Sequence, residues 1–148
     1  MANSVQYAKT VNTPSVKLDT TELHGRVRVA YAEFTSAAAQ ETINMFKLPD
    51  GARISGGRLN HAALGSSTTV SIGHAAYVNA AGTTVALDVD EYKAAASSAS
   101  ATGSAVAATT ALGENSLVDA PDGLIVTATT AGANATGKIE VQMTYVLD

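Results

Sequence analysis

The stretch Phe46-Lys47-Leu48-Pro49-Asp50-Gly51-Ala52-Arg53-Ile54-Ser55-Gly56-Gly57-Arg58-Leu59 decides the fold class. It predicts a strand, a tight turn and a second strand. Pro49 fixes φ at about −65° for the first corner of the turn, and Gly51 supplies the freedom to leave it. The glycine pair Gly56-Gly57 inside a strand pattern indicates a bulge or a close approach of another backbone. The chain is therefore predicted to be rich in β-structure.

Alternation of apolar and polar side chains predicts strands on both sides of this stretch. In the segment 25–34, Val27, Val29 and Tyr31 share one face, which is typical of a half-buried strand. The clearest alternation lies in the segment 138–147, whose inward-facing residues are expected to be Ile139, Val141, Met143 and Tyr145. Further strands are predicted over 41–48, 52–64, 68–78, 83–89 and 124–130. The expected fold is all-β, a jelly-roll-like β-sandwich or barrel.

Two segments differ from this pattern. Residues 1–24 are polar and contain Pro14, so we expect an extended N-terminal arm before a single β-sandwich domain over 25–148. The candidate partner contacts are its apolar side chains, Tyr7, Val11, Val16 and Leu18. Residues 91–100 are expected to form at most one short helix, because alanine has the highest helix propensity. The Ala/Ser/Thr-rich segment 94–110 has two possible interpretations, a flexible loop or a strand of small side chains.

Composition indicates a protein whose surface is covered in an assembly. The chain has 148 residues, enough for one domain that buries roughly 70% of its unfolded surface. Charged residues make up only 15% and aromatic residues 5%, and alanine, threonine, serine and glycine fill the difference. The net charge of −4 argues against a nucleic-acid partner. Up to Arg58 there are seven basic and five acidic residues, and after it two basic and eight acidic, an asymmetry that favours head-to-tail contacts between copies unless it arose by chance.

Targeting signals are not evident in the sequence. Residues 1–10 lack the apolar core of a signal peptide, and no run of the chain approaches 18 apolar residues, so we expect no membrane partner. The absence of cysteine excludes disulfides and fits synthesis in a reducing cytoplasm.

The candidates for chemistry are few. His24, His61 and His74 lie in different predicted elements, although His61 and His74 could meet across neighbouring strands. Ordinary sheet histidines are the favoured interpretation over a metal-binding pair. The acidic run Asp88-Val89-Asp90-Glu91 lacks the remaining ligands of a calcium loop, and we expect it to begin the short helix. We therefore predict no enzyme, no metal site and no cofactor.

The segment 25–58, together with the closing Gly137-Lys138-Ile139-Glu140-Val141-Gln142-Met143-Thr144-Tyr145-Val146, resembles the capsid decoration (cement) proteins of tailed bacteriophages. A strand ending in Lys-Leu-Pro-x-Gly-Ala-Arg-Ile is matched at 47–54. A Thr-Thr-Val-Ser-Ile-Gly strand is matched at 68–73, and the pattern closes on an alternating strand ending in Tyr-Val. The resemblance covers most of the chain after the arm, except for the segment 94–110.

The resemblance implies a structural role on the outside of a virion. The partners would be the major capsid protein and sister copies of the chain, and the effect would be to stabilise the icosahedral head. The abundance of small residues and the low charge favour a homotrimer over a dimer. The sequence leaves two alternatives. One is a carbohydrate- or host-surface-binding β-sandwich module, and the other is a small hydrolase, which is disfavoured because the sequence has no recognisable set of catalytic nucleophile and base.

Overall fold

A computed structural model describes residues 4–11, 17–18 and 25–148. Its helices are α1 (Val5–Val11) and the single 3-10 turn η1 (Thr110–Leu112). Its strands are β1 (Arg26–Ala39), β2 (Thr42–Leu48), β3 (Arg53–His61), β4 (Thr69–His74), β5 (Tyr77–Val78), β6 (Thr84–Val85), β7 (Asp88–Ser97), β8 (Thr102–Val106), β9 (Leu124–Ala131) and β10 (Ala135–Leu147). No helix in the described ranges is long and apolar enough to cross a membrane.

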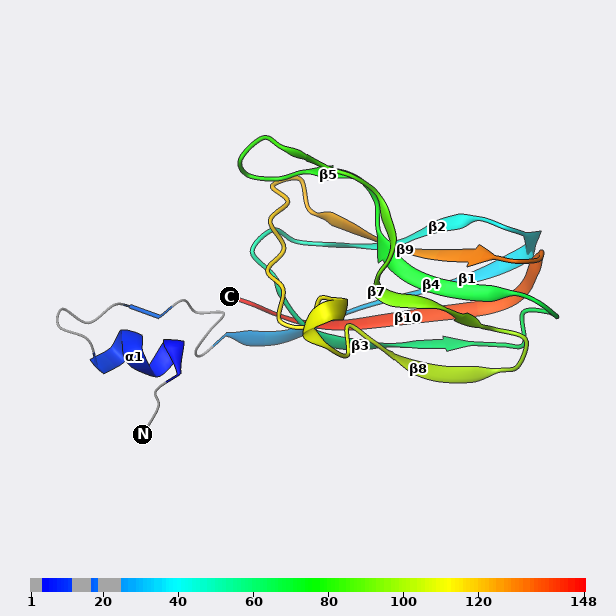
Figure 1. Ribbon diagram of the computed structural model, residues 1–148, viewed down its shortest axis with the longest axis horizontal. Coiled ribbons are helices and arrows are strands. Elements are labelled where there is room, and N and C mark those ends of the chain that lie inside the picture. The colour runs from blue at the N-terminus through cyan, green and yellow to red at the C-terminus, as the bar shows by residue number, and fades with distance from the viewer. Residues whose placement is uncertain (1–3, 12–16, 19–24) are drawn as a thin grey trace.

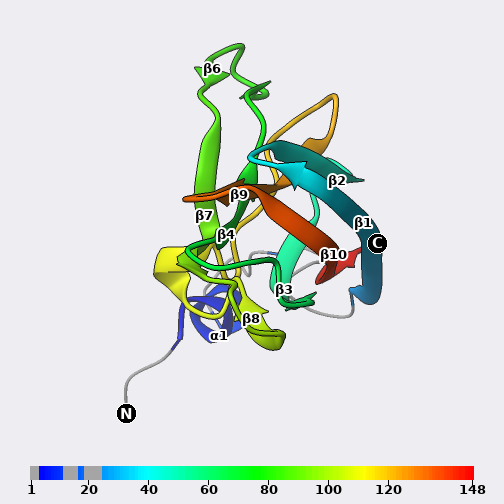
Figure 2. The same ribbon diagram turned by 90° about the vertical axis from the view of Figure 1, so that its right-hand side faces the viewer.

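The strands form two facing antiparallel sheets, as Figure 1 shows. Sheet A has the strand order β1-β10-β3-β8, and sheet B has the order β2-β9-β4-β7. β5 and β6 form a separate hairpin. By these orders β1 and β7 are edge strands of different sheets, and Figure 2 shows them at opposite sides of the molecule. The predicted all-β sandwich is confirmed.

The core lies between the two sheets. Sheet A contributes Ile139, Val141 and Met143 from its long central strand, and each of these side chains is fully buried. Sheet B contributes Ile72 and Val126, which are also fully buried. Lys138, Glu140 and Gln142 alternate with the buried set of β10 and reach solvent or the half-buried outer face. The predicted inward and outward faces of β10 are therefore confirmed.

The turn predicted at Pro49-Asp50-Gly51 is present, with one change in its corners. The amide of Ala52 donates to the carbonyl oxygen of Pro49 at 3.3 Å, which places Asp50 and Gly51 at the two corners. Pro49 therefore precedes the first corner instead of occupying it, a correction to the prediction. Gly51 has the expected left-handed φ of 75°.

The strand β3 contains the expected irregularity beside its paired glycines. Tyr145 pairs with Ile54 and Thr144 with Gly56, so Ser55 is an extra residue on the β3 side. A side chain at Gly57 would collide with the carbonyl oxygen of Gln142 on β10. The pair thus provides a bulge and a close approach at once.

The helix expected over 91–100 is wrong, because this segment belongs to strand β7. Tyr92 is buried in the core, and Ala96 and Ser97 pair with Val70 and Thr69 of β4. Pairing with β4 therefore outweighs the helix propensity of the alanines. The Ala/Ser/Thr-rich segment continues into β8 and η1, so part of it is a strand of small side chains.

Other boundaries differ modestly from expectation. The strand predicted over 68–78 is divided into β4 and β5, and the strand predicted over 83–89 is divided between β6 and the start of β7. The N-terminal segment is not extended throughout, because Val5–Val11 form α1. In Figure 1, α1 lies outside both sheets, beyond the end at which β1 begins.

Candidate interaction surface

The apolar arm residues singled out in the sequence differ in where the structure places them. Tyr7 and Val11 lie one helical turn apart on α1 and are exposed. Leu18 is partly buried, and Val16 lies outside the described residues. The described part of the arm thus presents two exposed apolar side chains on one face of a short helix.

A larger apolar surface lies on strand β1, which sequence reasoning did not identify. The alternation of Val27, Val29 and Tyr31 is present as predicted, but these side chains face away from the core. They are 68%, 56% and 54% exposed. The inward positions of β1 are instead Ala30, Ala32, Phe34 and Ser36.

The pairing register extends this surface across sheet A. Val27 pairs with Val146, Val146 with Arg53, and Arg53 forms an isolated bridge with Leu117. Directly paired residues on neighbouring strands point to the same face of a sheet. We define the outer patch as Val27, Val29, Tyr31, Val146 and Leu117. This patch occupies the end of the outer face at which β1 begins and β10 finishes.

A charged cluster borders the outer patch. The Tyr31 hydroxyl lies 3.0 Å from Glu33 Oε2 and 3.0 Å from Glu140 Oε1. Lys138 Nζ lies 2.7 Å from Glu33 Oε2 and 2.8 Å from Glu140 Oε1. One ammonium and one phenol thus bridge two carboxylates that stand directly opposite each other on β1 and β10. The cluster fixes the orientation of the Tyr31 ring within the patch.

The cluster shifts the pKa of each member. The hydrogen bond from Lys138 is the main cause that lowers the pKa of Glu33 and of Glu140. The pKa of Tyr31 rises to about 12, because its hydroxyl loses water and bonds to Glu140 and Glu33. The carboxylates therefore favour the folded state above their ordinary pKa of 4.5, and this contribution is lost as the pH falls through their lowered values.

Replacing Lys138 by methionine is expected to raise the pKa of both Glu33 and Glu140, since the two carboxylates would then repel without a bridging cation. Carboxyl carbon chemical shifts followed over an acid titration measure both values. Lys47→Met is the matched control, because Lys47 is exposed on β2 and has no part in the cluster. Unchanged glutamate titrations in Lys138→Met would contradict the bridged arrangement.

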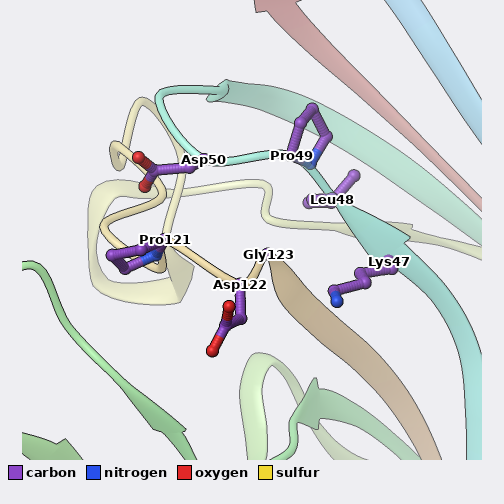
Figure 3. A pocket seen from close by; sticks show the side chains of 7 residues that line it. All are labelled: Lys47, Leu48, Pro49, Asp50, Pro121, Asp122 and Gly123. Carbon is purple, nitrogen blue, oxygen red and sulfur yellow. The ribbon is translucent and has the colours of Figure 1, made fainter.

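Two Pro-Asp-Gly turns meet at the same end of the sandwich. Asp50 Oδ1 accepts a hydrogen bond of 2.8 Å from the Ala120 amide, and the Gly51 amide donates to the Val118 carbonyl oxygen at 2.9 Å. Between the turns lies an open cleft of about 370 Å³, drawn in Figure 3 and lined by Lys47, Leu48, Pro49, Asp50, Pro121, Asp122 and Gly123. Its polar side chains are one lysine and two aspartates, and the rest of the lining is apolar or glycine.

Among the residues that the structure describes, the polar candidates do not assemble into a metal site, and His24 lies outside those residues. His61 lies on β3 and His74 on β4, in different sheets, so they are not cross-strand neighbours. Each holds its Nδ1 near a backbone oxygen, of Ala62 at 2.8 Å and of Ala75 at 2.9 Å. The run 88–91 begins strand β7 instead of a helix. Over residues 4–11, 17–18 and 25–148, no three His, Asp or Glu side chains gather in a metal-binding arrangement.

Chains of three solved phage capsid structures have a fold similar to that of this chain. One chain of the cyanophage Pam1 capsid asymmetric unit matches 84% of this chain and 86% of its own length, with a TM-score of 0.62 and 21% identity. A chain of the Ralstonia phage GP4 capsid matches the same shares, with a TM-score of 0.62 and 20% identity. A chain of the acid-stable capsid of Helicobacter pylori bacteriophage KHP30 matches 82% and 87%, with a TM-score of 0.57 and 20% identity. This chain has their fold.

The shared fold extends over nearly the whole of each matched chain. Because similar shares of both partners are covered, the matched capsid chains are about as long as this one. No protein-family model and no curated protein matches the sequence.

Proposed function

We propose that this chain is a structural protein of a phage virion. The observation that carries the proposal is a fold shared with chains of three phage capsids, over more than four fifths of this chain in each case. The surface of the described residues agrees, since exposed valines and a tyrosine form an apolar outer patch of the kind that a partner covers. The role is therefore one of surface contact and not of catalysis.

Within the virion, we assign the chain to the decoration layer on the outside of the major capsid protein lattice. The exposed apolar side chains that support this role belong to α1, the start of β1, the hairpin β5–β6 and the loop before β9. Figure 1 shows α1, the start of β1 and that hairpin at one end of the sandwich. Burying this end at a junction between capsomers would hold neighbours together, and repetition over the lattice makes weak single contacts persistent. A homotrimer fits the low charge and the abundance of small residues.

Deleting residues 1–18 is expected to leave the sandwich folded and to weaken its attachment to shells that lack the decoration layer. The arm carries the exposed Tyr7 and Val11, whereas the strands begin at Arg26. Circular dichroism tests folding and co-sedimentation with such shells tests attachment. Lys9→Glu in the full-length protein is a control that keeps the apolar side chains. Equal sedimentation of the truncated and full-length proteins would place the binding surface on the sandwich alone.

The carbohydrate- or host-binding alternative makes a different prediction. Sugar sites use exposed aromatic rings as stacking surfaces, and the exposed tyrosines of the described residues, Tyr7 and Tyr31, lie on separate elements. A glycan array separates the two roles, because specific glycan binding without binding to shells would replace the decoration role by this one.

A further inference from the structure

Strand β1 begins before sheet B covers it, so its first residues are exposed on both faces. Val27 and Val29 occupy the outer face, while Arg26 and Arg28 alternate with them and are also exposed. Burial begins only at Ala30. We define the β1 edge as residues 26–31. It combines three exposed apolar side chains with two cationic ones, on a strand whose far side has no ladder partner among the described residues.

A surface of complementary character lies at the opposite side of the molecule. Leu87 is exposed immediately before strand β7, and Val78 is exposed on the adjoining hairpin. The strand opens with Asp88, Asp90 and Glu91, of which Asp90 is exposed. Between the pairs His74↔Asp88 and Ile72↔Lys93, residues 89–92 of β7 lie opposite Gly73 alone, so this acidic segment departs from the regular ladder. We define the β7 edge as residues 87–91 with Val78.

The two edges are related in a way that suits rotation about one axis. β1 and β7 are edge strands of different sheets, and Figure 2 shows them on opposite sides. Both strands begin toward the same end of the sandwich. Arg26 pairs with the last residue of β10 and Asp88 with the last residue of β4, and β10 and β4 run in the same direction in Figure 1. Turning one copy about an axis parallel to the strands brings its β1 edge toward the β7 edge of the next. Heterologous contacts of this kind close into a ring when the rotation between copies divides a full turn, and otherwise form an open filament.

We propose that copies of this chain associate head to tail, with the β1 edge of one copy docked against the β7 edge of the next. Arg26 and Arg28 then face Asp90 and Glu91, and the valines of β1 face Leu87 and Val78. A second copy is the occupant because the two edges are complementary in charge and both expose apolar side chains. The inference adds the self-contact to the proposed decoration role and does not depend on attachment to a shell.

Charge reversal tests the pairing of the edges. Native mass spectrometry and light scattering over a concentration series are expected to show the wild-type chain as a closed oligomer that weakens with added salt. Arg26→Glu with Arg28→Glu, and separately Asp90→Arg with Glu91→Arg, are each expected to weaken self-association at least about tenfold. All four substitutions in one chain are expected to restore most of the loss. Arg58→Glu is the matched control, since Arg58 is exposed on β3 away from both edges.

Net charge alone does not reproduce this pattern, because the two double variants change it in opposite directions. If the fourfold variant fails to fold by circular dichroism, mixing the two double variants replaces it, since their edges complement each other and should co-assemble into mixed oligomers. A wild type that stays monomeric, or folded double variants that associate as the wild type does, would overturn the proposal. The proposal would also be overturned if self-association returned neither in the folded fourfold variant nor in the mixture of the two double variants. Shell binding is measured separately by co-sedimentation, so its failure would count against the decoration role alone.

Discussion

Replacing Val141 by aspartate is expected to lower the free energy of unfolding by about 3 kcal/mol or more, a large part of the about 5–15 kcal/mol that holds a typical domain folded. Val141 is fully buried at the centre of β10, the long strand of sheet A. It pairs with Ala32 of β1 on one side and with Leu59 of β3 on the other. A carboxylate at this position would be a buried charge among apolar side chains.

Thermal and urea unfolding followed by circular dichroism measure this effect. Gln142→Asp is the matched control, because it introduces the same side chain one residue later, on the exposed face of β10. That change is expected to cost no more than about 1 kcal/mol, the span of strand preferences at exposed sites. Glu140→Gln, on the same outer face, is expected to be close to neutral because surface ion pairs contribute little. Equal losses at 141 and 142 would mean that the register of β10 is wrong.

Replacing Gly73 by alanine is expected to destabilise the protein by about 1–3 kcal/mol through overpacking. Gly73 lies on β4, next to the wide irregularity in its pairing with β7. A Cβ atom at this position would collide with the backbone of Asp88 and Val89. Because backbone atoms cannot turn aside as a flexible side chain does, β7 would have to move away from β4.

The same unfolding measurements, combined with hydrogen exchange at the amides of residues 88–91, test this prediction. Ser71→Ala is the control, since Ser71 also lies buried on β4 and the change removes volume instead of adding it. We expect faster exchange at the start of β7 in Gly73→Ala and little change in Ser71→Ala. Protection equal to that of the wild type would contradict the close approach of the two strands.

Most strands could be predicted because their side chains alternate between core and solvent. β10 is the clearest case, with Ile139, Val141 and Met143 buried between polar neighbours. The segment 91–100 could not be predicted in the same way. Its alanines favour a helix locally, and the pairing of Lys93, Ala96 and Ser97 with β4 makes it a strand. That pairing joins positions distant in sequence, and a local pattern does not contain it.

The outer patch was missed for a related reason. Alternation over 26–31 separates valines from arginines, which favours an inward apolar face. Continued through the whole strand, the same alternation places Glu33 with Val27 and places Phe34 on the opposite face. The face that Val27 shares with Glu33 is therefore the outer one. Helix α1 was not predicted, because the polar segment 1–24 with its Pro14 favours an extended arm.

The account rests on the proposal that the chain is a structural component on the outside of a phage head. The most direct test is to purify the particles produced by the genome that encodes this chain, to quantify the chain relative to the major shell protein by mass spectrometry, and to label intact particles with an antibody against it. We expect a fixed, high ratio to the shell protein and labelling over the whole surface of the head. Absence of the chain from the particles, or its confinement to a few copies at one vertex or on the tail, would contradict the account.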